Sequence, residues 1–180
     1  MPATYKPTSI LYLELTHERV REIIDYDPET GIFRWKVNRG PKKAGTIAGA
    51  INGSGYLVIA IENSSIRANR LAWFWMTGRW PSLEIDHKNQ VKSDDRWTNL
   101  REATVSQNSA NRKTKKRDLP RGVFRQGSSY CAKIRRNGAN IYRHGFSSPE
   151  EAQKEYLRLF SEIHGAEFYP TQPFSETEER

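Results

Sequence analysis

The chain has 180 residues, of which 36% are hydrophobic and 20 are aromatic, and this composition predicts packed structure in one or two domains. No apolar run approaches the ~18 residues that span a membrane, and the first residues lack the basic start and apolar stretch of an export signal. The single cysteine, Cys131, excludes an internal disulfide and a CxxC-type zinc site, so we expect a reduced, cytoplasmic protein.

The net charge of +8 is concentrated in the middle of the chain. Residues 101–145 carry 12 Lys and Arg side chains against two acidic ones. Such a segment suits a polyanion, because phosphates that it neutralises release their counterions. For residues 111–121 alone, a solvated basic linker is an equally good interpretation. The basic residues continue beyond it into patterned sequence, and this favours nucleic acid.

The first half of the chain predicts alternating helices and strands. We expect a helix over 16–25 that Thr16 caps, and a second helix over 69–81 that Gly78 and Pro81 end. Between them, alternating apolar residues predict strands over 32–37 and 56–62, and Pro28 and Gly31 mark a turn before the first of these strands.

The remainder predicts a short strand, a helix and then a small sheet. "LEIDH" (83–87) is strand-like, "QVKSDD" is rich in turn residues, and "TVSQNSANRK" (104–113) is a candidate helix. Strands are expected over 121–126, 129–136 and 140–146, because Gly127-Ser128 and Asn137-Gly138 are hairpin signals. A capped amphipathic helix over 147–165 follows. We therefore predict an α+β chain whose last part is a three-stranded antiparallel sheet packed on one helix.

The most informative stretch begins at Asp86-His87, and Asn99 and Asn108 follow at intervals of 12 and 9. A divalent ion and a neutral histidine can together hydrolyse a phosphodiester, and carboxylate and amide oxygens suit Mg²⁺. Adjacent residues on a strand point to opposite faces, so a bend is needed, and Asn99 is the candidate to hold it by bonding loop backbone. A polar surface loop leading into a helix is the alternative.

The whole segment "LEIDHKNQVKSDDRWTNLREATVSQNSANRK" resembles the HNH endonucleases, in the branch of phage and intron-encoded homing or nicking enzymes. The upstream stretches "IIDYDPETGIFRWK" and "RLAWFWMTGRWP" also resemble that branch. The resemblance implies a ββα-metal motif that uses Mg²⁺ or Mn²⁺. It makes His87 the general base, Asp86 and Asn108 the metal ligands, and Asn99 the residue that fixes the loop, with His87, Asn99 and Asn108 as the catalytic triplet of an HNN variant.

Two positions depart from that pattern. Asn69 stands where many relatives have a histidine, and we assign it to packing because it lies outside the triplet. The loop after Asp86-His87 lacks the glycine that is often found there, so its turn is less well defined.

Residues 121–165 resemble the Apetala-type (ethylene-response) DNA-binding domain, through "RGV", "YCAKIRRNG", "IYRHGF" and "SPEEAQKEY". The resemblance implies a sheet that enters the major groove. Alternation places Ala132, Ile134, Ile141 and Phe146 toward the helix. Arg143 stands at a usually apolar position and leaves the register of the third strand open. The expected DNA-binding residues are Arg112, Lys113, Arg121, Arg125, Lys133, Arg135, Asn140 and Tyr142.

Together these patterns predict a metal-dependent DNA endonuclease. We expect an HNH nuclease domain with an N-terminal α+β extension (1–111), a basic linker (112–119), an Apetala-type domain (120–168) and a flexible tail (169–180). The expected partner is double-stranded DNA, without a membrane or small-molecule cofactor, for a monomer in the cytoplasm (of the host cell, if phage-encoded). The alternative is a sequence-specific DNA-binding protein whose nuclease site is inactive. An RNA-binding module is disfavoured because no RNP-type aromatic motif is present.

Overall fold

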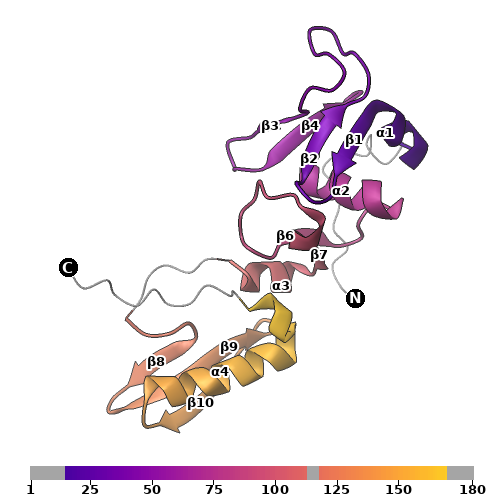
Figure 1. Ribbon diagram of the computed structural model, residues 1–180. Coiled ribbons are helices and arrows are strands. Elements are labelled where there is room, and N and C mark those ends of the chain that lie inside the picture. Colours follow the sequence, from indigo (N-terminus) through magenta and orange to yellow (C-terminus); the bar gives the residue numbers. More distant parts are fainter. Residues whose placement is uncertain (1–14, 113–117, 170–180) are drawn as a thin grey trace, which may run out of the picture. The chain divides into compact units, whose positions relative to one another are not determined.

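The computed structural model describes residues 15–112 and 118–169, and the chain divides into two compact units, Met1–Val105 and Ser106–Arg180. Helices and short antiparallel sheets occur in both units, which confirms the predicted α+β class (Figure 1). The border falls within α3 (Val105–Ala110), ahead of the linker expected at 112–119, and residues 113–117 lie outside the described part. None of the helices in the described ranges is long and apolar enough to cross a membrane.

Over its described residues, 15–105, the first unit contains helices α1 and α2 and three small antiparallel sheets, of order β1-β2, β3-β4-β5 and β6-β7. A 3-10 turn, Trp97–Asn99, precedes the last strand. The elements are α1 (His17–Ile23), β1 (Ile24–Asp27), β2 (Ile32–Trp35), β3 (Ala50–Ile51), β4 (Leu57–Ile61), β5 (Ser64–Arg67), α2 (Ala68–Thr77), β6 (Glu84–His87) and β7 (Leu100–Ala103).

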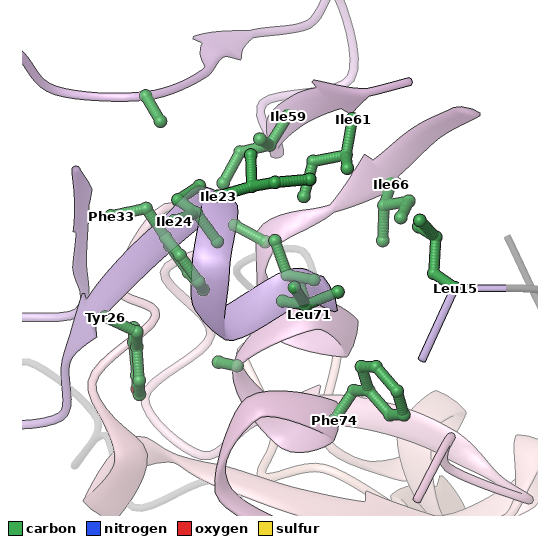
Figure 2. Close-up of a cluster of buried hydrophobic side chains, with 14 of the residues drawn as sticks. Leu15, Ile23, Ile24, Tyr26, Phe33, Ile59, Ile61, Ile66, Leu71 and Phe74 are labelled. Carbon is green, nitrogen blue, oxygen red and sulfur yellow. The ribbon is translucent and has the colours of Figure 1, made fainter. Parts of the chain in front are cut away.

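The core of the first unit joins both helices to the sheets. Figure 2 shows Ile59 and Ile61 of β4 beside Ile23 of α1, with Leu71 of α2 below them. Burial of each such side chain stabilises the fold by about 1.5–3 kcal/mol relative to exposure. Phe33 of β2 is also fully buried, so the first hairpin belongs to the same core.

The helix ends follow the sequence signals. The Thr16 side chain accepts a hydrogen bond from the Arg19 amide, and Gly78 ends α2 in the left-handed region with φ of 71°. α1 ends at Ile23, two residues earlier than expected, because Ile24 turns into β1 and pairs with Trp35.

Strands β1, β3 and β5 were not predicted. Each has four residues or fewer, and β5 reads "SSIR", in which only one residue is apolar. Alternation cannot be recognised over so short a span. These strands form because they pair with neighbouring strands, and a local sequence pattern does not contain such pairings.

Helix α2 positions the strand that carries the candidate site. The Asn69 side chain donates to the Ile85 carbonyl at 3.0 Å, and the Arg70 guanidinium donates to the Leu83 and Pro81 carbonyls, each at 3.2 Å. Asn69 and Arg70 are buried, so these bonds satisfy backbone groups that water does not reach. They fix the path of the chain into β6.

The loop between β6 and β7 rests on the β1–β2 hairpin. The Tyr26 hydroxyl donates to the Asp95 carbonyl at 2.7 Å, and the Trp97 amide donates to the Pro28 carbonyl at 3.0 Å. Gly31 has a φ of +74°, and a Cβ at that position would lie 2.6 Å from backbone atoms of Asp95 and Arg96. The glycine therefore allows hairpin and loop to approach closely.

The second unit has the three-stranded antiparallel sheet and helix that the sequence predicts. Its sheet has the order β10-β9-β8, from β8 (Val123–Gln126), β9 (Ser129–Arg136) and β10 (Ala139–Phe146). Helix α4 (Pro149–His164) packs against all three strands, and a 3-10 turn (Ala166–Phe168) follows it. Ser148 caps α4 by accepting from the Glu151 amide. Gly127 and Asn137-Gly138 occupy the two hairpin turns with positive φ.

Strand β10 shows why Arg143 stands at a position where an apolar residue was expected. Arg143 pairs with Ala132 and so lies on the side of the sheet that faces α4, where its Nε is 3.7 Å from a Glu155 carboxylate oxygen. The pairing then shifts between Arg143 and Phe146, a stretch that includes Gly145 with φ of +87°.

The close approach at Gly31 gives a test of how the loop is supported. Gly31→Ala and Gly45→Ala should each lower the free energy of unfolding by about 1–2 kcal/mol, because an alanine is strained at positive φ. Nothing lies within 4 Å of a Cβ at Gly45, whereas Gly31→Ala also forces the loop away. We therefore expect a larger loss of unfolding free energy for Gly31→Ala in urea denaturation. Equal losses would contradict the close approach.

Candidate active site

Asp86 and His87 form the end of β6, and both are buried, with relative exposures of 6% and 5%. In the β6–β7 ladder Asp86 stands opposite Arg101 and His87 opposite Leu100. Neighbouring residues of a strand project to opposite faces. Each of the two side chains accordingly has its own partner.

The Asp86 carboxylate is paired with the guanidinium of Arg101. Arg101 donates to Asp86 Oδ2 through Nε at 2.9 Å and lies 2.8 Å from the same oxygen through Nη2. A charge-assisted pair of this kind compensates for the burial of the carboxylate. Arg101 also balances the negative charge of Asp86 beside His87.

His87 is held by Asp95, which lies eight residues further along the same loop. His87 Nε2 lies 3.0 Å from Asp95 Oδ1, and Asp95 is only 2% exposed. Burial raises the pKa of the Asp95 carboxyl, and the bond to His87 opposes that shift. With a carboxylate accepting at Nε2, the proton of neutral His87 resides on Nε2 and the lone pair on Nδ1.

Asn99 closes the loop between the two strands. Its Oδ1 accepts from the Asn89 amide at 3.0 Å, and its Nδ2 donates to Asn89 Oδ1 at 3.0 Å and to the Asp94 carbonyl at 2.7 Å. The Lys88 amide also donates to the Asn99 carbonyl. Asn99 thus fixes the segment that runs from His87 to Asp95.

Asn108 lies on α3, within the unit Ser106–Arg180. Its expected role as a metal ligand remains a prediction. Among the residues that the structure describes, no group of three or more His, Cys, Asp or Glu side chains could hold a metal ion.

Four of the expected DNA-binding residues share one face of the second unit's sheet. Lys133 pairs with Tyr142 and Arg135 pairs with Asn140, whereas Ala132, Ile134 and Ile141 alternate with them on the α4 side. The Lys133 ammonium lies 5.3 Å from the Tyr142 ring centroid and 5.7 Å from that of Phe124. We call this set, Phe124, Lys133, Arg135, Asn140 and Tyr142, the outer sheet face.

The other expected basic residues lie elsewhere. Arg125 pairs with Tyr130 and alternates with Phe124, so the register places it on the opposite side of the sheet from Lys133, and its expected role in DNA binding remains a prediction. Arg121 donates to the carbonyls of Ala110 at 2.5 Å and Arg112 at 3.5 Å, and so bonds to backbone. Lys113 lies outside the described residues.

Asp95 and Arg101 are the functional candidates that the sequence reasoning missed. Asp95 is the second residue of an acidic pair in a turn-rich stretch, where a solvated side chain is the usual outcome. Arg101 could have been placed opposite Asp86 only with the hairpin register in hand. Neither residue type indicates a functional role by itself, and only the contacts with His87 and Asp86 identify the two residues.

Comparison with protein families finds a match to a family model described as HNH endonuclease, over residues 67–110. The match spans Asp86, His87, Asn99 and Asn108 together with β6 and β7. No curated protein and no solved structure matches the chain. The matched segment supports a nuclease-type hydrolase that acts on DNA, and it does not include the sheet of the second unit.

The hydrogen bonds of Asn99 predict its effect on stability. Asn99→Ala removes the partners of the Asn89 amide and the Asp94 carbonyl, so we expect a loss of about 1–3 kcal/mol. Asn38→Ala, which removes one exposed loop bond to the Ala44 amide, should cost about 0.5 kcal/mol or less. Chemical denaturation of both variants measures the two losses of unfolding free energy. Indistinguishable losses would argue against the loop-closing role of Asn99.

Proposed function

We propose that this protein is a metal-dependent DNA endonuclease of the homing or nicking type, with His87 as its general base. The observation that carries the proposal is the buried His87–Asp95 pair next to Asp86, inside the segment that matches HNH endonucleases. A general base must present a lone pair to water, and a carboxylate that holds the proton on the other ring nitrogen favours that state.

His87 would take the proton of the attacking water at Nδ1. Asp95 keeps the other ring proton at Nε2 and stabilises the imidazolium that forms when Nδ1 is protonated. Asn99 acts one step further away, because its bonds set the loop on which Asp95 lies. Asp95 and Asn99 are thus positioning residues for the base.

Asp86 would bind the divalent ion, Mg²⁺ or Mn²⁺, and Asn108 is the proposed second ligand. Asp86 suits the role, because it is a buried carboxylate whose charge one guanidinium balances, and a hard oxygen donor is what Mg²⁺ prefers. When bound, the ion would polarise the phosphate and stabilise the leaving oxygen.

The second unit would hold the DNA through the outer sheet face, in the manner of an Apetala-type domain. Lysine, arginine, asparagine and tyrosine side chains on one exposed face can contact phosphates and base edges. The basic residues around the linker would add sequence-independent attraction.

The Arg101–Asp86 pair favours a second candidate, a DNA-binding protein with an inactive site. Arg101 already balances the charge of Asp86, so the carboxylate is satisfied without an ion. In that case the protein would bind DNA and cleave none of it.

Cleavage and binding by two site variants separate the proposed roles. His87→Ala should abolish cleavage of a supercoiled plasmid in Mg²⁺, and Asp95→Asn should lower kcat by about 10²–10⁴-fold, because each removes the oriented base. Neither change touches an expected DNA contact, so Kd for the same DNA should stay within about twofold. Asp25→Asn, an exposed acidic residue of β1, is the charge-matched control and should cleave normally. Lost binding in His87→Ala, or normal cleavage by it, would refute the assignment.

The register of the sheet provides a matched pair of arginines for testing the outer sheet face. Arg135→Ala should weaken DNA binding by about 1–3 kcal/mol if Arg135 contacts a base edge, whereas Arg125→Ala removes the same charge from the other side of the sheet and should weaken binding less. Fluorescence anisotropy with labelled duplex DNA measures both. Equal affinities of the two variants would contradict this DNA-binding face.

A further inference from the structure

Three side chains from separate parts of the first unit meet beside His87. Tyr56 precedes β4, Arg67 ends β5, and Lys92 lies in the loop between β6 and β7. The Arg67 guanidinium carbon is 4.5 Å and the Lys92 ammonium 5.0 Å from the Tyr56 ring centroid. The Tyr56 and His87 ring centroids are 6.1 Å apart. We call Tyr56, Arg67 and Lys92 the Tyr56 cluster.

The cluster carries two positive charges that no described carboxylate neutralises by an ion pair. The ion pairs of the described residues involve neither Arg67 nor Lys92, although other arginines of the first unit, such as Arg19 and Arg96, are paired with acids. Arg67 and Lys92 are both exposed. Two cations beside one ring repel each other, and an anion bound between or beside them would relieve that repulsion.

Backbone contacts hold the cluster in place. Asn52 Oδ1 accepts from the Tyr56 amide at 3.0 Å, and the Tyr56 carbonyl accepts from the Asn52 amide at 2.9 Å, so Tyr56 ends a closed turn. The Lys92 ammonium donates to the Ser54 carbonyl of that turn at 2.9 Å. The backbone of Arg67 is held by its pairing with Val58 in the β4–β5 ladder. These contacts restrict where the two cations can lie, which lowers the entropic cost of binding.

We propose that Arg67 and Lys92 bind backbone phosphates of the DNA strand that is cut, next to the scissile phosphate, with Tyr56 holding both cations in position. Phosphates recur about every 3.4 Å along the axis of each strand. The Tyr56 ring centroid lies 6.1 Å from that of His87, the proposed general base, so the cluster can reach the nucleotides next to the scissile phosphate. The inference rests on the proposed function and deepens it, since it assigns a substrate-binding site outside the metal ligands, the base and the sheet of the second unit.

The test uses the full chain and its Arg67→Ala, Lys92→Ala and double variants, with Lys154→Ala as a control that removes one exposed charge from α4. We would measure Kd for labelled duplex DNA over a range of salt concentrations, and KM and kcat for cleavage in Mg²⁺. Arg67→Lys keeps the charge and should restore most of the affinity. Thermal melting reports whether each variant is folded.

Each single variant should lower the slope of log Kd against log salt by about 0.9, and the double variant by about twice as much. KM should rise about tenfold in the double variant while kcat stays within about twofold, because the contacts act equally in the ground and transition states. Lys154→Ala should change neither.

A folded double variant with the Kd, salt slope and KM of Lys154→Ala would overturn the inference, even if the wild type cleaves DNA as proposed. A wild-type protein that cleaves no DNA would instead refute the proposed function. The salt slopes of binding would still decide whether Arg67 and Lys92 contact phosphates.

Discussion

The hydrogen bond between His87 and Asp95 is the contact on which the candidate site depends. A buried carboxylate is costly, so the chain must hold Asp95 close to its partner. Tyr26 anchors the Asp95 carbonyl, and Gly31 lets the hairpin approach the same stretch of backbone. Asn99 closes the loop from the other side. A histidine held in this way has a defined tautomer, which a reaction that removes a proton from water requires.

The charged groups at the site form two separate pairs. Asp86 is balanced by Arg101 across the hairpin, and His87 by Asp95 within the loop, so the two adjacent residues of β6 operate through separate partners. Arg67 and Lys92 lie exposed at the Tyr56 ring near His87, where we propose that they contact the DNA backbone. Strand alternation alone produces this separation, because it sends neighbouring side chains to opposite faces.

Much of this arrangement follows from local sequence. The Thr16 cap, the Gly78 stop, the Asn137-Gly138 hairpin and the amphipathic α4 are short-range signals, and the structure contains each of them. The short strands β1, β3 and β5 and the partners Asp95 and Arg101 could not be found in that way. They depend on contacts such as that of Tyr26 with Asp95, 69 residues away, which only the folded chain brings together. The position of Arg143 could not be explained from local sequence for the same reason, since its acidic neighbour Glu155 belongs to a later helix.

The central claim is that the Asp86-His87 segment is a metal-dependent hydrolytic site, and the most direct measurement is cleavage of supercoiled plasmid by the wild-type protein under three metal conditions. We predict nicked or linear product in Mg²⁺ or Mn²⁺ and none when EDTA is present. Tight binding of the plasmid without product in either metal would contradict the claim and leave a DNA-binding protein. Product that persists in EDTA would contradict the role of the ion.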